Sequence, residues 1–139
     1  VIFEYKIVDE VTKIIKNASE EVDHLVVSFH FGDEYELVHN QRQEYLAHRA
    51  IDAGAKIVVG HHSHVIEDTE IYKNGFIAYS LGNFIFDQGF SANTMKGMLL
   101  EIKLERNGSV SINKNTVYLN NLFQPEKVIF GKEEKVKFE

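Results

Sequence analysis

The chain has 139 residues, a length that fits one domain with a buried core. It carries 15 basic and 21 acidic side chains, and this net charge of -6 makes nucleic acid an unfavourable partner. There is no cysteine, which excludes disulfides and thiolate zinc sites, and no apolar run approaches the roughly 20 residues that span a bilayer. The composition indicates a globular domain and leaves its compartment open.

The first half of the chain alternates strand and helix patterns. The first five residues resemble the middle of a strand, so we expect the chain to begin inside a larger protein. Apolar periodicity then predicts a helix over residues 9–18, a buried strand over 24–28, a helix over 40–53 and a second buried strand over 55–60. Two continuous apolar strands joined by a helix indicate an α/β fold, a mixed sheet with flanking helices.

The second half of the chain is predicted to be β-rich. Short strands are expected over residues 71–72, 75–79 and 84–86, and strict alternation predicts a longer strand over 98–104. Asn107-Gly108 indicates a hairpin turn, with a return strand over 109–119. We assign residues 1–125 to one domain and residues 126–139 to a charged tail that is expected to fray.

A histidine cluster, His61-His62-Ser63-His64, directly follows the strand over 55–60. Ligands of α/β sheets collect beyond the carboxyl ends of strands, and neutral imidazole is the commonest protein ligand of borderline transition metals. The cluster therefore predicts a metal site, in which His64 is the safer ligand and the choice between His61 and His62 stays open. The plainer alternative is a polar loop with exposed histidines.

His30 ends the preceding strand and is predicted to reach the same sheet edge as the cluster. One turn later, Asp33 and Glu34 could complete a metal shell, orient an imidazole, or simply be solvated. Asn83 lies in a polar turn and could either hold that turn or direct its amide at a metal or oxyanion. The catalytic candidates are thus His64, Asn83 and Glu34, and the candidate metal ligands are His30, His61, His62 and His64.

Several segments, in order, resemble the bacterial capsule biosynthesis CapA family. These are His30-Phe-Gly-Asp-Glu-Tyr35, the helix ending in Ile51-Asp-Ala-Gly-Ala55, Val58-Val-Gly-His-His-Ser-His-Val65 and Tyr79-Ser-Leu-Gly-Asn-Phe-Ile-Phe-Asp87. Departures from the family pattern are Phe31 for tryptophan, His39 for proline, Lys56 for aspartate and Ser63 for proline. None of these departures removes a candidate ligand.

The resemblance implies a function in poly-γ-glutamate capsule synthesis. It implies the carboxyl-terminal half of a calcineurin-like metallophosphoesterase sandwich, a metal-dependent hydrolase that uses divalent manganese, iron, zinc or magnesium. Further ligands would come from an amino-terminal half that this sequence lacks, so we expect the isolated chain to be inactive. Membrane capsule synthesis proteins are further expected partners, and the parent is expected to be membrane-associated or extracytoplasmic. The alternative function is a non-catalytic scaffold or binding subunit of a membrane-associated capsule synthesis complex.

Overall fold

The computed structural model describes residues 2–105 and 109–137 and contains two helices and two sheets. In chain order the elements are α1 (Ile2–Glu20), β1 (Val26–Phe31), α2 (Gln41–Asp52), β2 (Ile57–His62), β3 (Thr69–Tyr72), β4 (Gly75–Ala78), β5 (Lys96–Leu104), β6 (Ser109–Leu119), β7 (Pro125–Ile129) and β8 (Glu133–Lys137). The predicted α/β class is confirmed. Neither helix, within the described ranges, combines the length and apolar character that crossing a bilayer requires.

The first sheet has the strand order β1-β2-β4-β3. β1, β2 and β4 run parallel, and β3 pairs antiparallel with β4 at the edge. Because parallel strands end at one edge, the segments that follow β1, β2 and β4 all emerge on the same side of the molecule. This topology brings together three segments that are far apart in the sequence.

The second sheet contains β5 to β8, with β6 at its centre. β6 pairs antiparallel with β5 along its length, and with β7 and β8 on its other side. The predicted strands over 98–104 and 109–119 are confirmed, whereas the Asn107-Gly108 turn lies outside the described residues. The tail was expected to fray, but residues 125–129 and 133–137 form β7 and β8, because β6 offers them a strand edge on which their backbone hydrogen bonds are completed.

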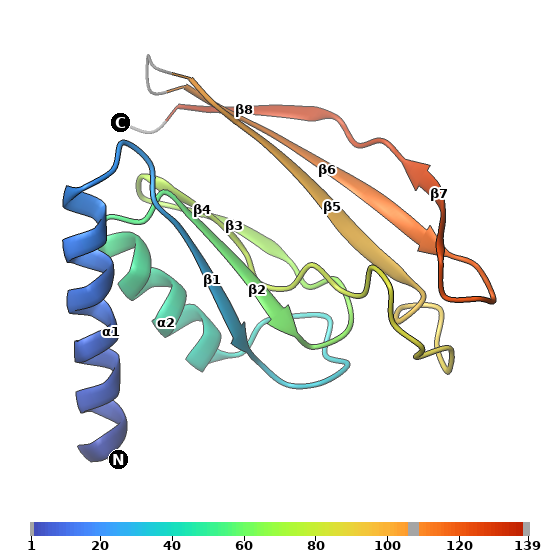
Figure 1. Ribbon diagram of the computed structural model, residues 1–139, viewed down its shortest axis with the longest axis horizontal. Helices are drawn as coiled ribbons and strands as arrows, with labels where there is room; N and C mark the ends of the chain where they lie inside the picture. The colour runs from blue at the N-terminus through green and yellow to red at the C-terminus, as the bar shows by residue number, and fades with distance from the viewer. Residues whose placement is uncertain (1, 106–108, 138–139) are drawn as a thin grey trace.

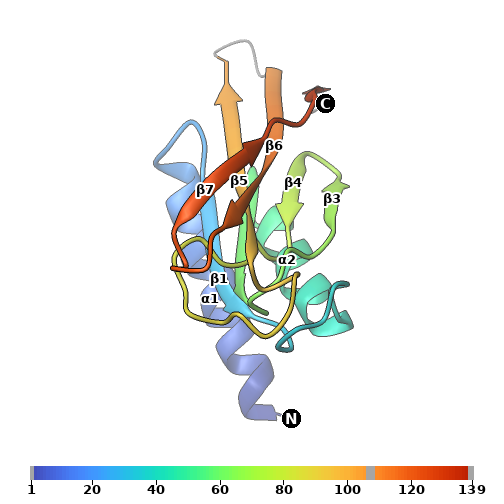
Figure 2. The same cartoon turned by 90° about the vertical axis from the view of Figure 1, so that its right-hand side faces the viewer.

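The elements form three layers (Figure 1). Both helices cover one face of the first sheet, and the second sheet lies across the other face, as the turned view in Figure 2 also shows. Val58 and Ile77 face the helices, while Ile57 and Phe76 face the second sheet. All four are essentially excluded from solvent, and burying each side chain stabilises the fold by about 1.5–3 kcal/mol. Two cores, one on each face, therefore hold the first sheet in place.

Helix α2 agrees with its sequence prediction at both ends. The Asn40 side chain accepts hydrogen bonds from the backbone N–H groups of Arg42 and Gln43, and the Gln43 side chain accepts one from the Asn40 N–H. Such a capping box contributes about 1 kcal/mol. Gly54, directly after the helix, has a φ of +110°, which other residues rarely adopt.

Two further sequence predictions are wrong. Residues 2–5 continue α1 instead of forming a strand: once a helix has nucleated, adding a turn is easier than beginning a strand without a partner. Residues 84–86 also form no strand, since pairing stops at the isolated Gly82–Gly97 bridge. The three side chains there, Phe84, Ile85 and Phe86, are exposed.

Candidate metal centre

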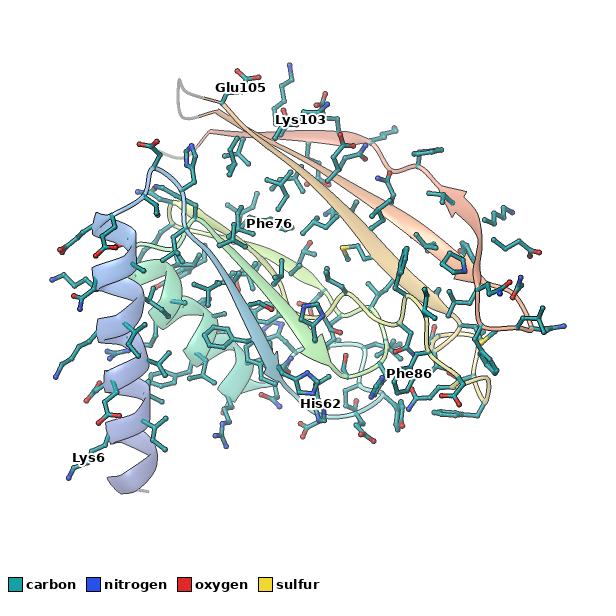
Figure 3. The ribbon with its side chains drawn as sticks, in the orientation of Figure 1. Lys6, His62, Phe76, Phe86, Lys103 and Glu105 are labelled. Atoms are coloured by element: carbon teal, nitrogen blue, oxygen red, sulfur yellow. The ribbon has the colours of Figure 1, made fainter. Side chains whose placement is uncertain are left out.

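The candidate site lies at the carboxyl edge of the three parallel strands. His30 stands near the end of β1 and His62 ends β2, while Asn83 follows β4 after a short turn. Figure 3 shows His62 at this end of the ribbon, with Phe86 from the later loop near it. The expectation that His30 and the histidine cluster share one sheet edge is therefore confirmed.

His30 and His62 are in direct contact. Nε2 of His30 lies 3.1 Å from Nδ1 of His62, and their ring centroids are 4.8 Å apart. The strand register pairs His30 with His61 instead, but the backbone of His62 has a φ of +110°. Non-glycine residues held in sparsely populated conformations often occur at functional sites. This unusual φ accompanies the turn that brings the His62 ring to His30.

His64 is linked to both the cluster and Asn83. Its ring centroid lies 6.3 Å from that of His62, and its Nδ1 lies 2.9 Å from Oδ1 of Asn83. The Asn83 Nδ2 donates to the carbonyl of Thr94, which can only accept, so Oδ1 is the atom that faces His64. The Nδ1 of His64 must then carry the proton, which leaves Nε2 available. His64 also has a positive φ, of 59°.

The remaining candidates are less closely engaged. His61 is half-buried, and both burial and the nearby His30 lower the pKa of its imidazole. Glu34 lies exposed in the loop after β1. Burial, and then the neighbouring Glu34 carboxylate, raise the pKa of Tyr35. Asp33 accepts a hydrogen bond of 2.7 Å from Asn40 and is thereby tied to the cap of α2. Neither carboxylate has a described hydrogen bond to His30, His62 or His64.

Aromatic side chains border the histidines on one side. The Phe86 ring lies 4.7 Å from that of His64, and the Tyr35 ring lies 6.2 Å from it. Phe90 packs edge-on against Tyr35, and Gln88 donates to the Tyr35 hydroxyl over 3.1 Å. Phe86, Gln88 and Phe90 therefore border the site, a role that the strand prediction over 84–86 did not reveal.

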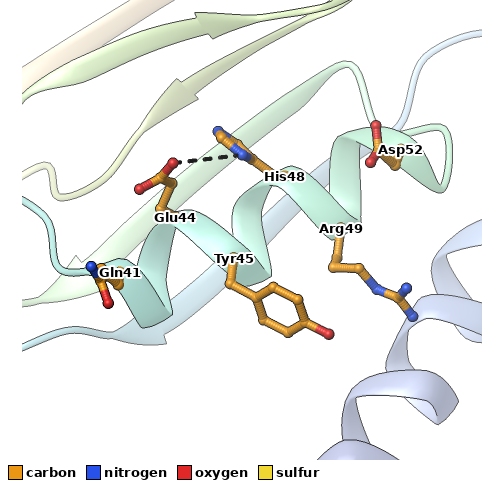
Figure 4. A pocket seen from close by; sticks show the side chains of 6 residues that line it. All are labelled: Gln41, Glu44, Tyr45, His48, Arg49 and Asp52. Atoms are coloured by element: carbon orange, nitrogen blue, oxygen red, sulfur yellow. Dashed lines mark ion pairs between the residues drawn. The ribbon is translucent and has the colours of Figure 1, made fainter.

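An open pocket of about 450 Å³ lies against the β1 side of the site, and its lining includes His30, Gly32 and His62. A second hollow, of about 400 Å³, lies on the outer face of α2 (Figure 4). Its lining contains none of the candidate residues. His48 there bonds Glu70, and Arg49 pairs with Asp9 over 2.8 Å. The first pocket therefore belongs to the candidate site and the second does not.

Among residues 2–105 and 109–137, no three His, Asp or Glu side chains are arranged to hold one metal ion. The chemistry of the available donors still fits an ion in part. Two nitrogens that bind one ion at about 2.0–2.1 Å lie roughly 3.0–3.4 Å from each other. His30 Nε2 and His62 Nδ1, at 3.1 Å, have this separation. The site thus offers two imidazole nitrogens at this separation and a third histidine nearby, which is fewer donors than a closed metal shell has.

Sequence reasoning overlooked one buried polar pair beside these loops. Glu67 follows the histidine cluster by three residues, and its carboxylate accepts a hydrogen bond of 2.7 Å from the Gln43 side chain. Both side chains are almost fully buried. Asn40-x-x-Gln43 ahead of a helix is a recognisable capping box, and this pattern is the signal that could have identified Gln43.

Fold and site together define an α/β protein with a histidine centre at the carboxyl edge of a parallel sheet. Residues 4–88 match the family model of the bacterial capsule synthesis protein PGA_cap, which is more than half of the chain. The chain belongs to this family. The matched range includes every candidate site residue and ends before β5.

Two curated relatives agree with this assignment. The PGA biosynthesis protein CapA of Bacillus subtilis (strain 168) is 46% identical over 96 residues, which cover 69% of this chain and 25% of that protein. The capsule biosynthesis protein CapA of Bacillus anthracis is 48% identical over 87 residues, which cover 63% of this chain and 21% of that protein. The chain thus matches a quarter or less of the length of each relative.

Proposed function

We propose that this chain supplies part of a metal-dependent, phosphoesterase-type hydrolase site in a CapA-like protein of poly-γ-glutamate capsule synthesis. The observation that carries the proposal is the 3.1 Å approach of His30 and His62 beside the His64–Asn83 pair. Three parallel strands deliver these side chains to one edge, the usual location of ligand sites in such sheets. The names of the family and of the two CapA relatives supply the capsule context.

In this proposal His30 and His62 hold a divalent ion, and His64 completes the histidine set. A bound manganese, iron, zinc or magnesium ion would polarise a substrate oxygen. With Nδ1 of His64 donating to Asn83, its Nε2 is free to bind the ion or, when protonated, to deliver a proton to a leaving oxygen. Asn83 fixes that ring, and Glu34 would influence the site through the neighbouring Tyr35.

The remaining ligands would come from a preceding amino-terminal half of the same calcineurin-like sandwich. Two observations support this. The described residues contain no three-ligand group, and β1 is an outer strand whose Val26 side chain is 52% exposed. The layer order of helices, first sheet and second sheet is compatible with one half of such a sandwich.

The second candidate is a non-catalytic scaffold or binding subunit of a membrane-associated capsule synthesis complex. The incomplete ligand group in the described residues is the observation that favours it. Both candidates have the same fold, so a measurement of turnover is needed to distinguish the enzyme from the scaffold.

The test uses the complete protein that contains this chain, assayed for hydrolysis of a phosphodiester with added manganese or zinc. We expect turnover that falls by about 10²-fold or more in His64→Ala, because loss of a general acid typically costs that much. Tyr45→Phe, at an exposed position on α2, is the matched control. A folded, metal-loaded protein with no hydrolysis would favour the scaffold.

A further inference from the structure

A buried amide–carboxylate pair lies beside two loops that adjoin the candidate histidines: the loop after β1, which follows His30 (the His30 loop), and the loop after β2, which runs from His62 through His64 (the His62–His64 loop). Nε2 of Gln43 donates to Oε2 of Glu67 over 2.7 Å, and the two side chains are 1% and 3% exposed. Gln43 lies in the first turn of α2, and Glu67 precedes β3. The pair bridges 24 residues of sequence.

Gln43 holds the loop that follows His30. Its Oε1 accepts from the backbone N–H of Asn40 over 2.9 Å, and the Asn40 side chain in turn donates to Asp33. Gly32, with a φ of +102°, packs so closely on Gln43 that an added Cβ would overlap the amide. The backbone that leaves His30 therefore rests directly on this side chain.

Glu67 holds the loop that contains His62 and His64. Burial raises the pKa of Glu67, while the hydrogen bond from Gln43 acts in the opposite direction. Ser63 lies between the two histidines and is fully buried. Its carbonyl accepts from the Tyr35 N–H over 2.8 Å, and its hydroxyl donates to the Val65 carbonyl over 3.0 Å. The Glu67 backbone N–H donates to the Ser80 carbonyl over 3.2 Å, so both the backbone and the side chain of Glu67 fix the chain where it leaves the histidine loop.

We propose that Gln43 and Glu67 are positioning residues that fix the His30 loop against the His62–His64 loop and thereby set the approach of the two imidazoles. The inference deepens the proposed function, on which it rests for the ligand, a divalent cation. The pair touches no reacting atom and acts only through the backbone of the two loops.

The chemistry of the pair favours positioning over simple packing. Burying a carboxylate is costly, and an apolar pair of similar size would usually stabilise a core as well or better. A charge-assisted hydrogen bond is directional, however, and so specifies one relative placement of the groups that it joins. In addition, the Oε1 atom of Glu67 is buried without a hydrogen-bond partner among the described residues, a cost that packing alone does not explain.

The test is a double-mutant cycle in the 139-residue chain that exchanges the amide and the carboxylate between positions 43 and 67. Glu67→Gln places two amides opposite each other, and Gln43→Glu places two carboxylates there. The double variant Gln43→Glu/Glu67→Gln restores an amide–carboxylate pair of reversed direction. The carboxylate introduced on α2 can still accept from the Asn40 N–H, because glutamate is a normal capping-box residue. Gln41→Glu adds the same charge at an exposed position of α2 and is the matched control.

The first readout needs no metal. Nuclear Overhauser contacts between the His30 and His62 rings, measured by NMR in the metal-free chain, report their approach. We expect these contacts to weaken in each folded single variant, to return in the double variant and to persist in Gln41→Glu. Unchanged ring contacts in folded single variants would overturn the proposal. If the single variants do not fold, Glu67→Asp takes their place, because it keeps the carboxylate but shortens the side chain by one methylene group. Unchanged contacts between the His30 and His62 rings in that variant would also overturn the proposal.

The second readout is the affinity for manganese or zinc, measured by titration calorimetry on the complete protein that contains this chain and carries the same substitutions. Partners that orient metal ligands typically contribute 10–100-fold in metal affinity, so we expect a loss of about tenfold in the single variants and recovery in the double variant. If the complete protein binds no cation while the NMR cycle behaves as expected, the proposed function fails and the positioning role stands. If the complete protein binds a cation with equal affinity in its unchanged form, both single variants and the double variant, the positioning role fails and the metal site stands.

Discussion

Nε2 of His30 lies 3.1 Å from Nδ1 of His62, although the parallel register of β1 and β2 places His61 opposite His30. The positive φ of His62 accompanies this change of partner. The sequence left open which of the two neighbouring histidines is the ligand, and the geometry favours His62.

We therefore predict that His62→Asn weakens binding of zinc or manganese by about tenfold or more, whereas His61→Asn leaves it largely unchanged. The physical reason is that a ring nitrogen of His62 lies 3.1 Å from one of His30, whereas the described hydrogen bonds include none between the rings of His61 and His30. Isothermal titration of both variants, with circular dichroism as a check of folding, measures the difference. Equal losses in the two variants would contradict the assignment.

The 139-residue chain by itself should bind divalent ions weakly and show negligible turnover. Its described residues offer two converging imidazoles and no carboxylate bonded to them, so little negative charge holds the ion. The expected binding free energy is far smaller than the about 10–16 kcal/mol seen for complete structural zinc sites. Titration and a phosphodiester assay check this, and tight stoichiometric binding with robust hydrolysis would show that the site is complete.

Asn83→Ala should affect both folding and the site. The change removes the bond to His64 and leaves the Thr94 carbonyl without that donor, which costs about 1–3 kcal/mol in the free energy of unfolding. In the complete protein we also expect turnover per folded molecule to fall by about 10²–10³. Denaturant unfolding and steady-state kinetics separate the two effects. A loss of stability with unchanged turnover would remove Asn83 from the site.

Glu67→Gln should change the pH dependence of stability. Burial raises the pKa of Glu67 in the folded chain, so its contribution is fully present below the ordinary value of 4.5 and is lost as pH rises through the raised value. The variant does not titrate there. Its free energy of unfolding relative to the unchanged chain should therefore increase as pH rises from about 4 to 8, by about 1.4 kcal/mol for each unit by which the pKa is raised. Urea unfolding at several pH values in this range measures the free energy of unfolding of both proteins. A difference between them that does not change with pH would contradict the prediction.

Tyr79→Phe should weaken the attachment of β3 to α2. The buried Tyr79 hydroxyl donates to Glu70 over 2.6 Å, and the Glu70 carboxylate also contacts His48. Desolvation opposes ionisation of Glu70, but the hydrogen bonds from Tyr79 and His48 outweigh it and lower its pKa. Loss of the Tyr79 bond should cost about 1.5–3 kcal/mol at neutral pH.

The same pair predicts a pH profile. A lowered pKa stabilises the folded chain above the ordinary value of 4.5, and this contribution is lost as pH falls through the lowered value. The stability difference between Tyr79→Phe and the unchanged chain should therefore shrink in acid. Tyr45→Phe, at an exposed position, is the control and should show no such profile. A stability difference between Tyr79→Phe and the unchanged chain that stays constant between about pH 3 and 7 would count against a hydrogen bond from Tyr79 to an ionised Glu70.

The sequence by itself determined the local elements whose patterns are self-sufficient. The Asn40 cap and Gly54 define α2, strict alternation predicts β5, and the Asn107-Gly108 signal predicts the return strand β6. The apolar runs before His30 and His61 predict β1 and β2, but only β2 is mostly buried, because β1 lies at the edge of the sheet. The motifs also identified the family and most of the candidate ligands. Each of these features depends on neighbours within a few residues, which is the range over which sequence patterns carry information.

Only the tertiary structure decided the contacts between distant segments. Strand pairing on β6 orders the residues after Pro125, and the lack of a pairing strand leaves residues 84–86 in a loop beside the site. The approach of His62 to His30, the hydrogen bond between His64 and Asn83 and the Gln43–Glu67 pair all join residues 19 to 32 positions apart. Their geometry depends on how parallel strands place loop ends at one edge, and no local pattern encodes that placement.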